Sequence, residues 1–253
     1  MTTLSHSPTA NALNAEACVD SAIAAVGKSI VLALPLGLGK ANLVANAFYQ
    51  RAQRDPELTL HIVTALSLEH PTSNDALGQR FLQPLVERLY ADVPELLYAQ
   101  ARRRGQLPEN VQVSEFFFNP GQLLSNASAQ QHYISSNYTH AVRDLHQAGV
   151  NVLAQMIAPH PTDPTQCSLS CNTDLSADLI DFANAKGKPL FCIGELNPQL
   201  PFMPNDAQLN VSVFDCLLDA SPERAGYPLF AIPNQPVSLT QYAIALHVSS
   251  LIE

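Results

Sequence analysis

The feature that most constrains the fold is a series of short apolar segments that alternate with segments of helical periodicity. Residues 29–36 (SIVLALPL) are apolar at every position after Ser29. A continuous apolar run of this length is typical of a parallel strand buried on both faces. Residues 40–55 follow with Leu43, Ala47 and Phe48 at helical spacing. We predict further strands at 58–66, 111–118, 150–158, 189–196 and 209–218, and further helices at 75–90, 138–148, 174–185 and 238–252. This alternation predicts an α/β fold, an open, mostly parallel sheet with flanking helices.

Length and composition limit the domain organisation. The chain has 253 residues, of which 47% are hydrophobic, and this suits one large or two small domains. We divide it into an N-terminal arm with a first helix (1–27), an α/β domain (28–236) and a closing helix (237–253). Only 14% of the residues are charged, against about 25% in average domains. We therefore expect part of the surface to be covered by another domain or by a second subunit.

The charge balance excludes several classes of partner. The formal net charge is −9, so the chain lacks the positive field that nucleic acids and anionic membranes require. The one basic run, Arg102 to Arg104, is either a solvated helix end or a local contact for an anion. The first 16 residues lack the pattern of a secretory signal, and no apolar stretch approaches the ~20 residues that span a bilayer. We expect a cytoplasmic protein with reduced cysteines.

Two kinds of chemistry find little support in the motifs. Cys167 and Cys171, with His160 nearby, could start a metal site, but the second half that zinc sites need is missing. We expect the two cysteines to be a structural thiol pair, with no metal and no tightly bound cofactor. Serines and a histidine occur close together, but the chain has no G-x-S-x-G sequence to present a serine nucleophile.

The candidate binding residues lie in loops that follow predicted strands. In an open parallel sheet the ligand binds beyond the carboxyl ends of the strands, here after Leu36, Phe118, Ala158 and Leu196. The glycines of PLGLGKAN (35–42) fit neither the P-loop nor the dinucleotide fingerprint, so they form either a tight turn or a cradle for a phosphate or an acyl group. The candidate substrate-binding residues are Gly37, Gly39, Asn119, Ser135, Ser136, Asn137, Tyr138, His140 and Asn197.

Two glutamates are weaker candidates for catalysis. Glu115 precedes three phenylalanines, where desolvation could raise its pKa, although a capping or ion-paired role is the simpler interpretation. Glu195 ends a predicted strand in the segment CIGELNPQLP (192–201), whose carboxylate and amide could form the wall of a site.

Four segments, in this order, resemble the acetyl-CoA hydrolase/transferase family, a branch of the family I CoA-transferases that includes 4-hydroxybutyrate CoA-transferase. They are LPLGLGKANLVANAFYQRA, SEFFFNPG, ISSNYTHAVRDLHQAGVNVLAQ and IGELNPQLP, and together they cover most of residues 29–204. The resemblance implies a chain of two α/β halves with the active site between them. It also implies a glutamate nucleophile that attacks an acyl-CoA thioester, after which a carboxylate acceptor gives transfer and water gives hydrolysis.

The same resemblance implies that the nucleophile belongs to a C-terminal half. No glutamate of this sequence stands in the expected E-x-G setting, and residues 237–253 resemble the helix that opens the second half. We therefore expect no catalytic residue on this chain and expect its own C-terminal domain or a second subunit to complete it, within a possible homo-oligomer. The alternatives are a non-catalytic module that binds CoA esters and a small self-sufficient thioester hydrolase that uses Glu195 or Glu115 with His140.

Overall fold

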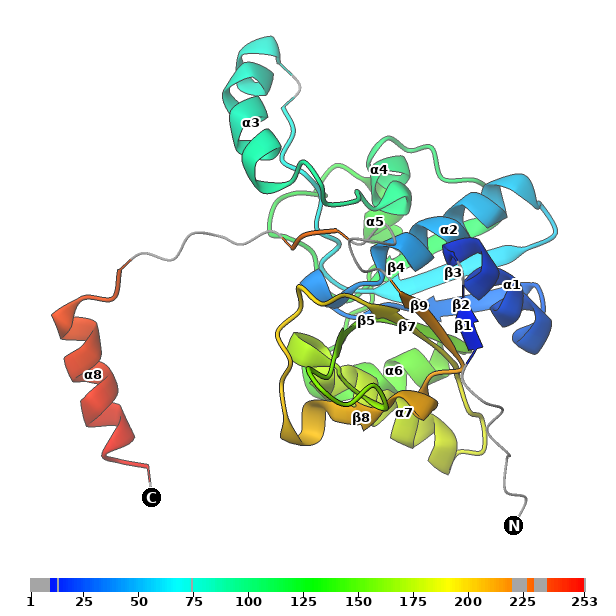
Figure 1. The fold of residues 1–253 in the computed structure, drawn as a ribbon. Helices are drawn as coiled ribbons and strands as arrows, with labels where there is room; N and C mark the ends of the chain where they lie inside the picture. The colour runs from blue at the N-terminus through cyan, green and yellow to red at the C-terminus, as the bar shows by residue number, and fades with distance from the viewer. Residues whose placement is uncertain (1–9, 13, 74, 220–226, 230–235, 253) are drawn as a thin grey trace.

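The computed structural model describes residues 10–12, 14–73, 75–219, 227–229 and 236–252. Its centre is a sheet in which seven strands run parallel in the order β1–β9–β7–β5–β2–β3–β4, with two short antiparallel strands, β6 and β8, attached to β5 (Figure 1). The strands are β1 (Ala10–Ala12), β2 (Ser29–Ala33), β3 (Thr59–Thr64), β4 (Val111–Glu115), β5 (Val152–Pro159), β6 (Gln166–Ser168), β7 (Phe191–Leu196), β8 (Gln208–Asn210) and β9 (Cys216–Asp219). The predicted open, mostly parallel sheet is confirmed.

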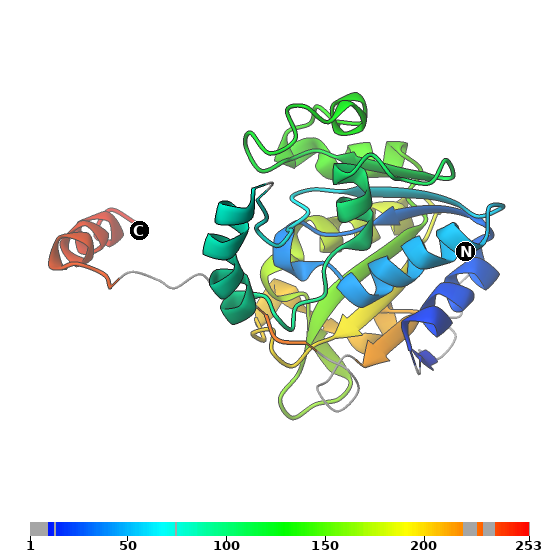
Figure 2. The same cartoon turned by 90° about the horizontal axis from the view of Figure 1, so that it is seen from above.

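Helices cover both faces of the sheet, which explains why the strands are apolar on both sides. The helices α1 (Ala15–Val26), α2 (Asn42–Arg54) and α4 (Leu97–Arg103) pack on one face, and α6 (Ala141–Gln147) and α7 (Thr173–Ala185) pack on the other (Figures 1 and 2). A short helix, α5 (Ala127–Gln131), follows the loop after β4. The molecule therefore has three layers with a hydrophobic core on each side of the sheet.

The structure differs from the sequence prediction in three places. The predicted strand 209–218 is split, because Val211–Val213 form a 3-10 turn between β8 and β9. The side chain of Asn210 starts this turn by accepting a hydrogen bond from the backbone N–H of Ser212 at 2.9 Å. Part of the expected loose arm forms β1, which pairs with β9. The short elements α4 and β6 were not predicted. Residues 1–9 of the expected arm, and residues 220–226 and 230–235 of the expected α/β domain (28–236), lie outside the described residues.

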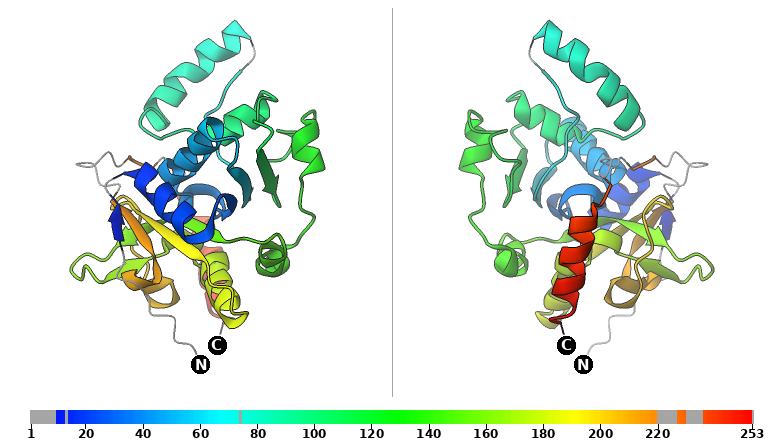
Figure 3. Two further views of the ribbon diagram at one scale, coloured as in Figure 1. Left: turned by 90° about the vertical axis from the view of Figure 1, so that its right-hand side faces the viewer. Right: turned by 90° about the vertical axis from the view of Figure 1, so that its left-hand side faces the viewer.

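Two helices stand apart from the layered body. The helix α3 (Ala76–Leu89) projects from it in Figures 1 and 3, and α8 (Leu239–Ser249) lies apart from it in Figures 1 and 2. Ser238 caps α8 in a capping box with Gln241. Apolar side chains on both helices are exposed, for example Leu77 and Phe81 on α3. None of the helices in the described ranges has both the length and the apolar character needed to cross a bilayer.

Candidate functional site

The loops that follow β2 and β3 are held together by one buried lysine. Lys40 is 1% exposed, and its Nζ donates to the carbonyl oxygens of Pro35 at 2.6 Å, Ala65 at 2.5 Å and Leu66 at 3.3 Å. Burial lowers the pKa of Lys40 to about 7, while nearby Glu115 opposes this change and Arg102 reinforces it. Lys40 thus fixes the carboxyl-end loops of two neighbouring strands at one point.

The loop after β3 turns sharply at Leu66. This residue has φ +45°, in the left-handed region that side chains other than glycine rarely adopt. Its N–H donates to Phe117 O at 2.8 Å and its carbonyl accepts from Lys40, so both of its backbone polar groups are fixed. A strained conformation persists where its surroundings fix it in this way, and such residues often lie at binding sites.

A buried ion pair lies directly below this loop. Arg102 Nη1 at the end of α4 lies 3.0 Å from Glu115 Oε1 at the end of β4, and the two side chains are 2% and 1% exposed. Ser67 donates a short hydrogen bond to the same carboxylate, and its hydroxyl lies 2.8 Å from that of Tyr98. Burial raises the pKa of Tyr98, so this phenol stays protonated. Glu115 therefore has the ion-paired role that was the simpler interpretation of its sequence.

A polar cavity of about 860 Å³ opens beside this network, at the carboxyl ends of β3 and β4. A smaller cleft of about 30 Å³ shares four of its residues and extends toward the turn after β2. Of the predicted site residues, Asn119 lines the cavity and Gly37 lines the cleft. The cavity is lined by residues 66–73, Tyr90, Arg103, Asn119, Gln122, Leu123, Ser125 and Asn126. The loops after Leu36 and Phe118 thus border adjoining cavities, and this is the candidate site.

Glu69, which was not predicted as a site residue, lines both the cavity and the cleft. Its side chain is 3% exposed, and Oε2 lies 3.4 Å from Arg103 Nη1. Burial raises the pKa of Glu69, while Arg103 and Arg102 lower it. The basic run at 102–104 is therefore not a solvated helix end as a whole. Arg102 is buried, Arg103 lines the cavity and only Arg104 is exposed.

Glu195 points away from this cavity and into the fold. It is 0% exposed, and Oε2 accepts a hydrogen bond from Val44 N–H at 3.1 Å, in the first turn of α2. Helix α2 has no side-chain cap of its own, so a carboxylate from β7 stabilises its N-terminus. Tyr227 donates its hydroxyl to Oε1 at 2.8 Å. Burial raises the pKa of Glu195 to about 7, although these hydrogen bonds act against the rise.

Asn197 also holds the segment around Tyr227. Its side-chain amide donates to Tyr227 O at 3.0 Å and its side-chain oxygen accepts from Gln199 N–H at 2.9 Å, with 1% of the residue exposed. Tyr227 in turn lines the small cleft. The structure thus places Asn197 behind the wall of the cleft, where it positions Tyr227.

The remaining predicted residues lie elsewhere. Ser135, Asn137, Tyr138 and His140 are exposed, and Ser136 is half-buried; none of the five lines the cavity or the small cleft. Their segment follows α5 and starts beside the end of β4, where Ile134 N–H donates to Glu115 O at 2.9 Å. Partial burial raises the pKa of Tyr138 to about 12, and Asp174 adds to the rise.

The described residues give no support to a metal centre. Within them, no group of three or more histidine, cysteine, aspartate or glutamate side chains could hold a metal ion. Cys167 is buried with its Sγ 3.6 Å from Leu209 O, and Cys171 is exposed next to Asn172. These two thiols do not form a pair.

The two glycines of the turn after β2 have different roles. Gly37 has φ +66°, which a side chain would strain, and it leaves open space where a Cβ would stand. At Gly39 a Cβ would lie 2.1 Å from Asn172 Oδ1, and Asn172 itself donates to Leu36 O at 2.9 Å. Gly39 therefore allows the turn to pack against another part of the chain.

We expect Gly39→Ala to lower the free energy of unfolding by about 1–3 kcal/mol, because the added methyl group overlaps the side chain of Asn172. Urea denaturation measures the change. In an Asn172→Ala background the same substitution should cost clearly less, since the overlapping atoms are gone. An equal cost in both backgrounds would show that the overlap is not the cause.

Comparisons with known proteins find similarity in the fold. No protein-family model matches the sequence, and no curated protein matches it. The structure is similar to RipA from Yersinia pestis, with a TM-score of 0.56 and 14% identity over 96% of this chain and 48% of that chain. A point mutant of RipA gives a TM-score of 0.58 at the same identity and coverage. A lower TM-score of 0.45, at 12% identity, relates 96% of this chain to 46% of 4-hydroxybutyrate CoA-transferase from Porphyromonas gingivalis.

The chain spans about half the length of the solved structures that it matches. The likeness is one of fold: this chain is folded as about half of RipA is.

Proposed function

We propose that this chain is one half of an acyl-CoA hydrolase or CoA-transferase. It would shape the cleft for the CoA ester, and the attacking glutamate would come from a second domain or subunit. The observation that carries the proposal is the position of the two candidate glutamates. Glu115 and Glu195 are 1% and 0% exposed, both are hydrogen-bonded inside the fold, and neither lines the cavity. A nucleophile must reach the thioester carbon, and these carboxylates do not face an open site.

Two further observations support the existence of a second domain or subunit that completes the site. The chain matches only about half of RipA, as the division into two halves requires. In addition, α3 exposes Leu77 by 77% and Phe81 by 80%, and α8 exposes Leu246 by 70%. Exposed apolar groups of this size on projecting helices are typical of surfaces that another domain covers. The substrates would be an acyl-CoA and either a carboxylate acceptor or water.

The alternative of a self-sufficient hydrolase requires Glu195 or Glu115 to act with His140. His140 is exposed in the segment after α5 and lines neither the cavity nor the small cleft. A non-catalytic module that binds CoA esters shares the cavity but needs no second half.

The proposal is tested by incubating the chain with acetyl-CoA and measuring binding by calorimetry, together with hydrolysis and acyl exchange. We expect binding with turnover at the background level. In a second arm, sodium borohydride is added, since it reduces an enzyme-bound glutamyl thioester to an alcohol that mass spectrometry locates. An adduct on a glutamate of this chain, or no affinity for acetyl-CoA, would contradict the proposal. Turnover that appears when a candidate second half is added separates it from the non-catalytic module.

A further inference from the structure

One carboxylate oxygen in the wall of the cavity is buried without a donor. Glu69 Oε2 accepts no hydrogen bond from the described residues, and its side chain is 3% exposed. Arg103 Nη1 lies 3.4 Å away, which is longer than the 2.7–3.2 Å of a good N–H···O bond. Burying a charged acceptor without a donor is unfavourable. A ligand in the cavity that supplies the donor would remove this cost.

The rest of the cavity shows which kind of ligand fits. Glu69 and Arg103 are of opposite charge and face each other, so the wall offers little net charge. The other polar side chains that line the cavity are uncharged hydroxyls and amides, together with the imidazole of His70. Backbone polar groups line it as well. The hydroxyls belong to Ser67, Thr72, Ser73, Tyr90 and Ser125, and the amides to Asn119, Gln122 and Asn126. A phosphate would need several cations, whereas an uncharged ligand needs many donors and acceptors of this kind.

We propose that the cavity binds an uncharged, hydrogen-bonding part of the ligand that donates a hydroxyl or amide hydrogen to Glu69 Oε2. This inference rests on the proposed function, because that function indicates which molecules would supply the hydroxyl or amide. Every CoA ester has one such part, the pantetheine arm, which has two amides and a hydroxyl, and a hydroxyacyl-CoA has a second, the hydroxyl of its acyl group. The 3′-phosphoadenosine diphosphate part would lie outside the cavity.

The test uses the whole chain and NMR titration with small uncharged probes. Pantetheine represents the arm, and methyl 3-hydroxybutyrate represents a hydroxyacyl group, with methyl butyrate as its control without a hydroxyl. Adenosine 3′,5′-bisphosphate represents the nucleotide part. Acetyl-CoA is titrated separately, so that a failure of the proposed function is seen independently of the result for Glu69.

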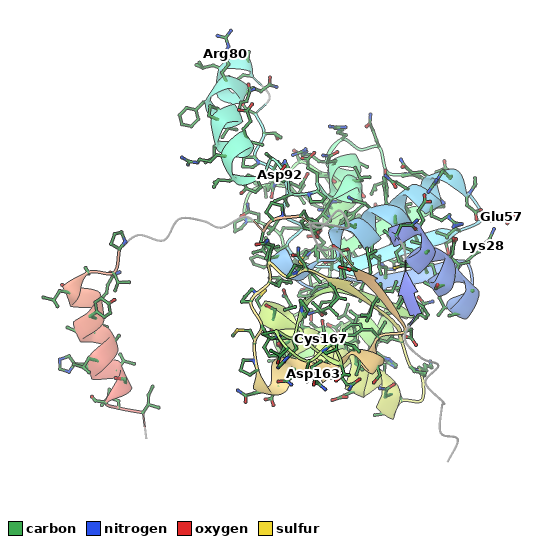
Figure 4. The ribbon with its side chains drawn as sticks, viewed as in Figure 1. Lys28, Glu57, Arg80, Asp92, Asp163 and Cys167 are labelled. Carbon is green, nitrogen blue, oxygen red and sulfur yellow. The ribbon has the colours of Figure 1, made fainter. Side chains whose placement is uncertain are left out.

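Two variants of the cavity and one control sharpen the result. Glu69→Gln should lower the affinity for the probe about tenfold, because a charge-assisted hydrogen bond becomes a neutral one. Gln122→Ala removes an exposed lining side chain, so it should leave folding intact and weaken binding about two- to fivefold. Glu57→Gln is the matched control, since its carboxylate is 82% exposed beside Lys28 at the far end of the molecule from α3 (Figure 4). It should change nothing.

Binding of pantetheine or of methyl 3-hydroxybutyrate that depends on Glu69 supports the inference, and the probe that binds identifies the source. The inference is overturned if neither probe binds, if Glu69→Gln and Gln122→Ala bind as the unaltered chain does, or if the bisphosphate occupies the cavity. If acetyl-CoA binds with equal affinity to the unaltered chain and to Glu69→Gln, the proposed function is supported and the inference about Glu69 is contradicted. If pantetheine binds and acetyl-CoA does not, the inference about Glu69 is supported and the proposed function is contradicted.

Discussion

Replacing Arg102 with methionine should lower the free energy of unfolding by about 3–5 kcal/mol, the largest loss that we expect from any single substitution in this chain. The change leaves the carboxylate of Glu115, which is 1% exposed, without the guanidinium 3.0 Å away. It also removes the charge that lies 5.5 Å from the centre of the Phe118 ring. Urea denaturation at pH 7 measures the loss.

The partner substitution tests whether the ion pair causes the effect. Glu115→Gln should also be strongly destabilising, because it leaves the guanidinium buried without a counter-charge. The double variant Arg102→Met, Glu115→Gln should then lose much less than the sum of the two single losses, since neither charge remains. Arg54→Met is the matched control on the surface, where the arginine pairs with Glu16 and both side chains are more than half exposed. Additive losses in the double variant would show that shape, and not charge, makes Arg102 important.

The same substitution should affect the cavity. Ser67 bonds to Glu115 and also lines the cavity, and the neighbouring Leu66 is fixed by Lys40. Loosening the ion pair therefore frees the loop after β3 at the point where it forms the wall. Probe binding should weaken in parallel with stability, and NMR shifts of Leu66 and Ser67 would report this change directly.

The ion pair also shows what the sequence could and could not predict. The apolar runs and helical spacings were enough for the layered α/β fold, because a strand buried on both faces leaves a pattern that few other structures share. The general location of the site followed from the same topology, since the carboxyl ends of parallel strands meet at one edge. Gly37 and Asn119, chosen for their place after strands, do line the adjoining cavities.

The individual residues of the candidate site could not be predicted in the same way. Arg102 lies in the last turn of a helix of only seven residues, which is too short to show a period, and its partner Glu115 is on another element. Lys40 looks like any polar residue at a helix start until the carbonyls of two loops are placed around it. The dense polar run at 135–140 was chosen for its composition, but its residues are mostly exposed and line neither the cavity nor the small cleft. Pairings between distant segments leave no local signal.

Glu195 should make the stability of the chain fall as pH rises. Its pKa is about 7 in the folded chain because of burial, against an ordinary value of 4.5. Between these values the folded state holds a proton that the unfolded state has released, so the contribution of Glu195 to the free energy of unfolding decreases from about pH 4.5 to about pH 7 and is constant above. The difference of about 2.5 pH units corresponds to about 3 kcal/mol.

Glu195→Gln should remove this pH dependence, because an amide of the same shape stays neutral. Its oxygen can accept from Val44 N–H, and its amino group can donate to the hydroxyl of Tyr227, which then rotates to serve as acceptor. We therefore expect the variant to match the unaltered chain near pH 4.5 and to be more stable by up to about 3 kcal/mol at pH 8. Urea denaturation at intervals between these values measures the difference, and Glu57→Gln, with its exposed carboxylate, should show none.

Comparing each variant with the unaltered chain separates Glu195 from other titrating groups. Lys40, whose pKa is lowered by burial, changes stability in the opposite direction and above pH 7, and it is present in both proteins. The difference in the free energy of unfolding between Glu195→Gln and the unaltered chain is the deciding quantity. If this difference stays constant with pH, the carboxylate of Glu195 is ionised throughout the range. The ionised carboxylate would then stabilise the start of α2 as an anion, and Glu195 would be held by the helix N-terminus more strongly than burial opposes it.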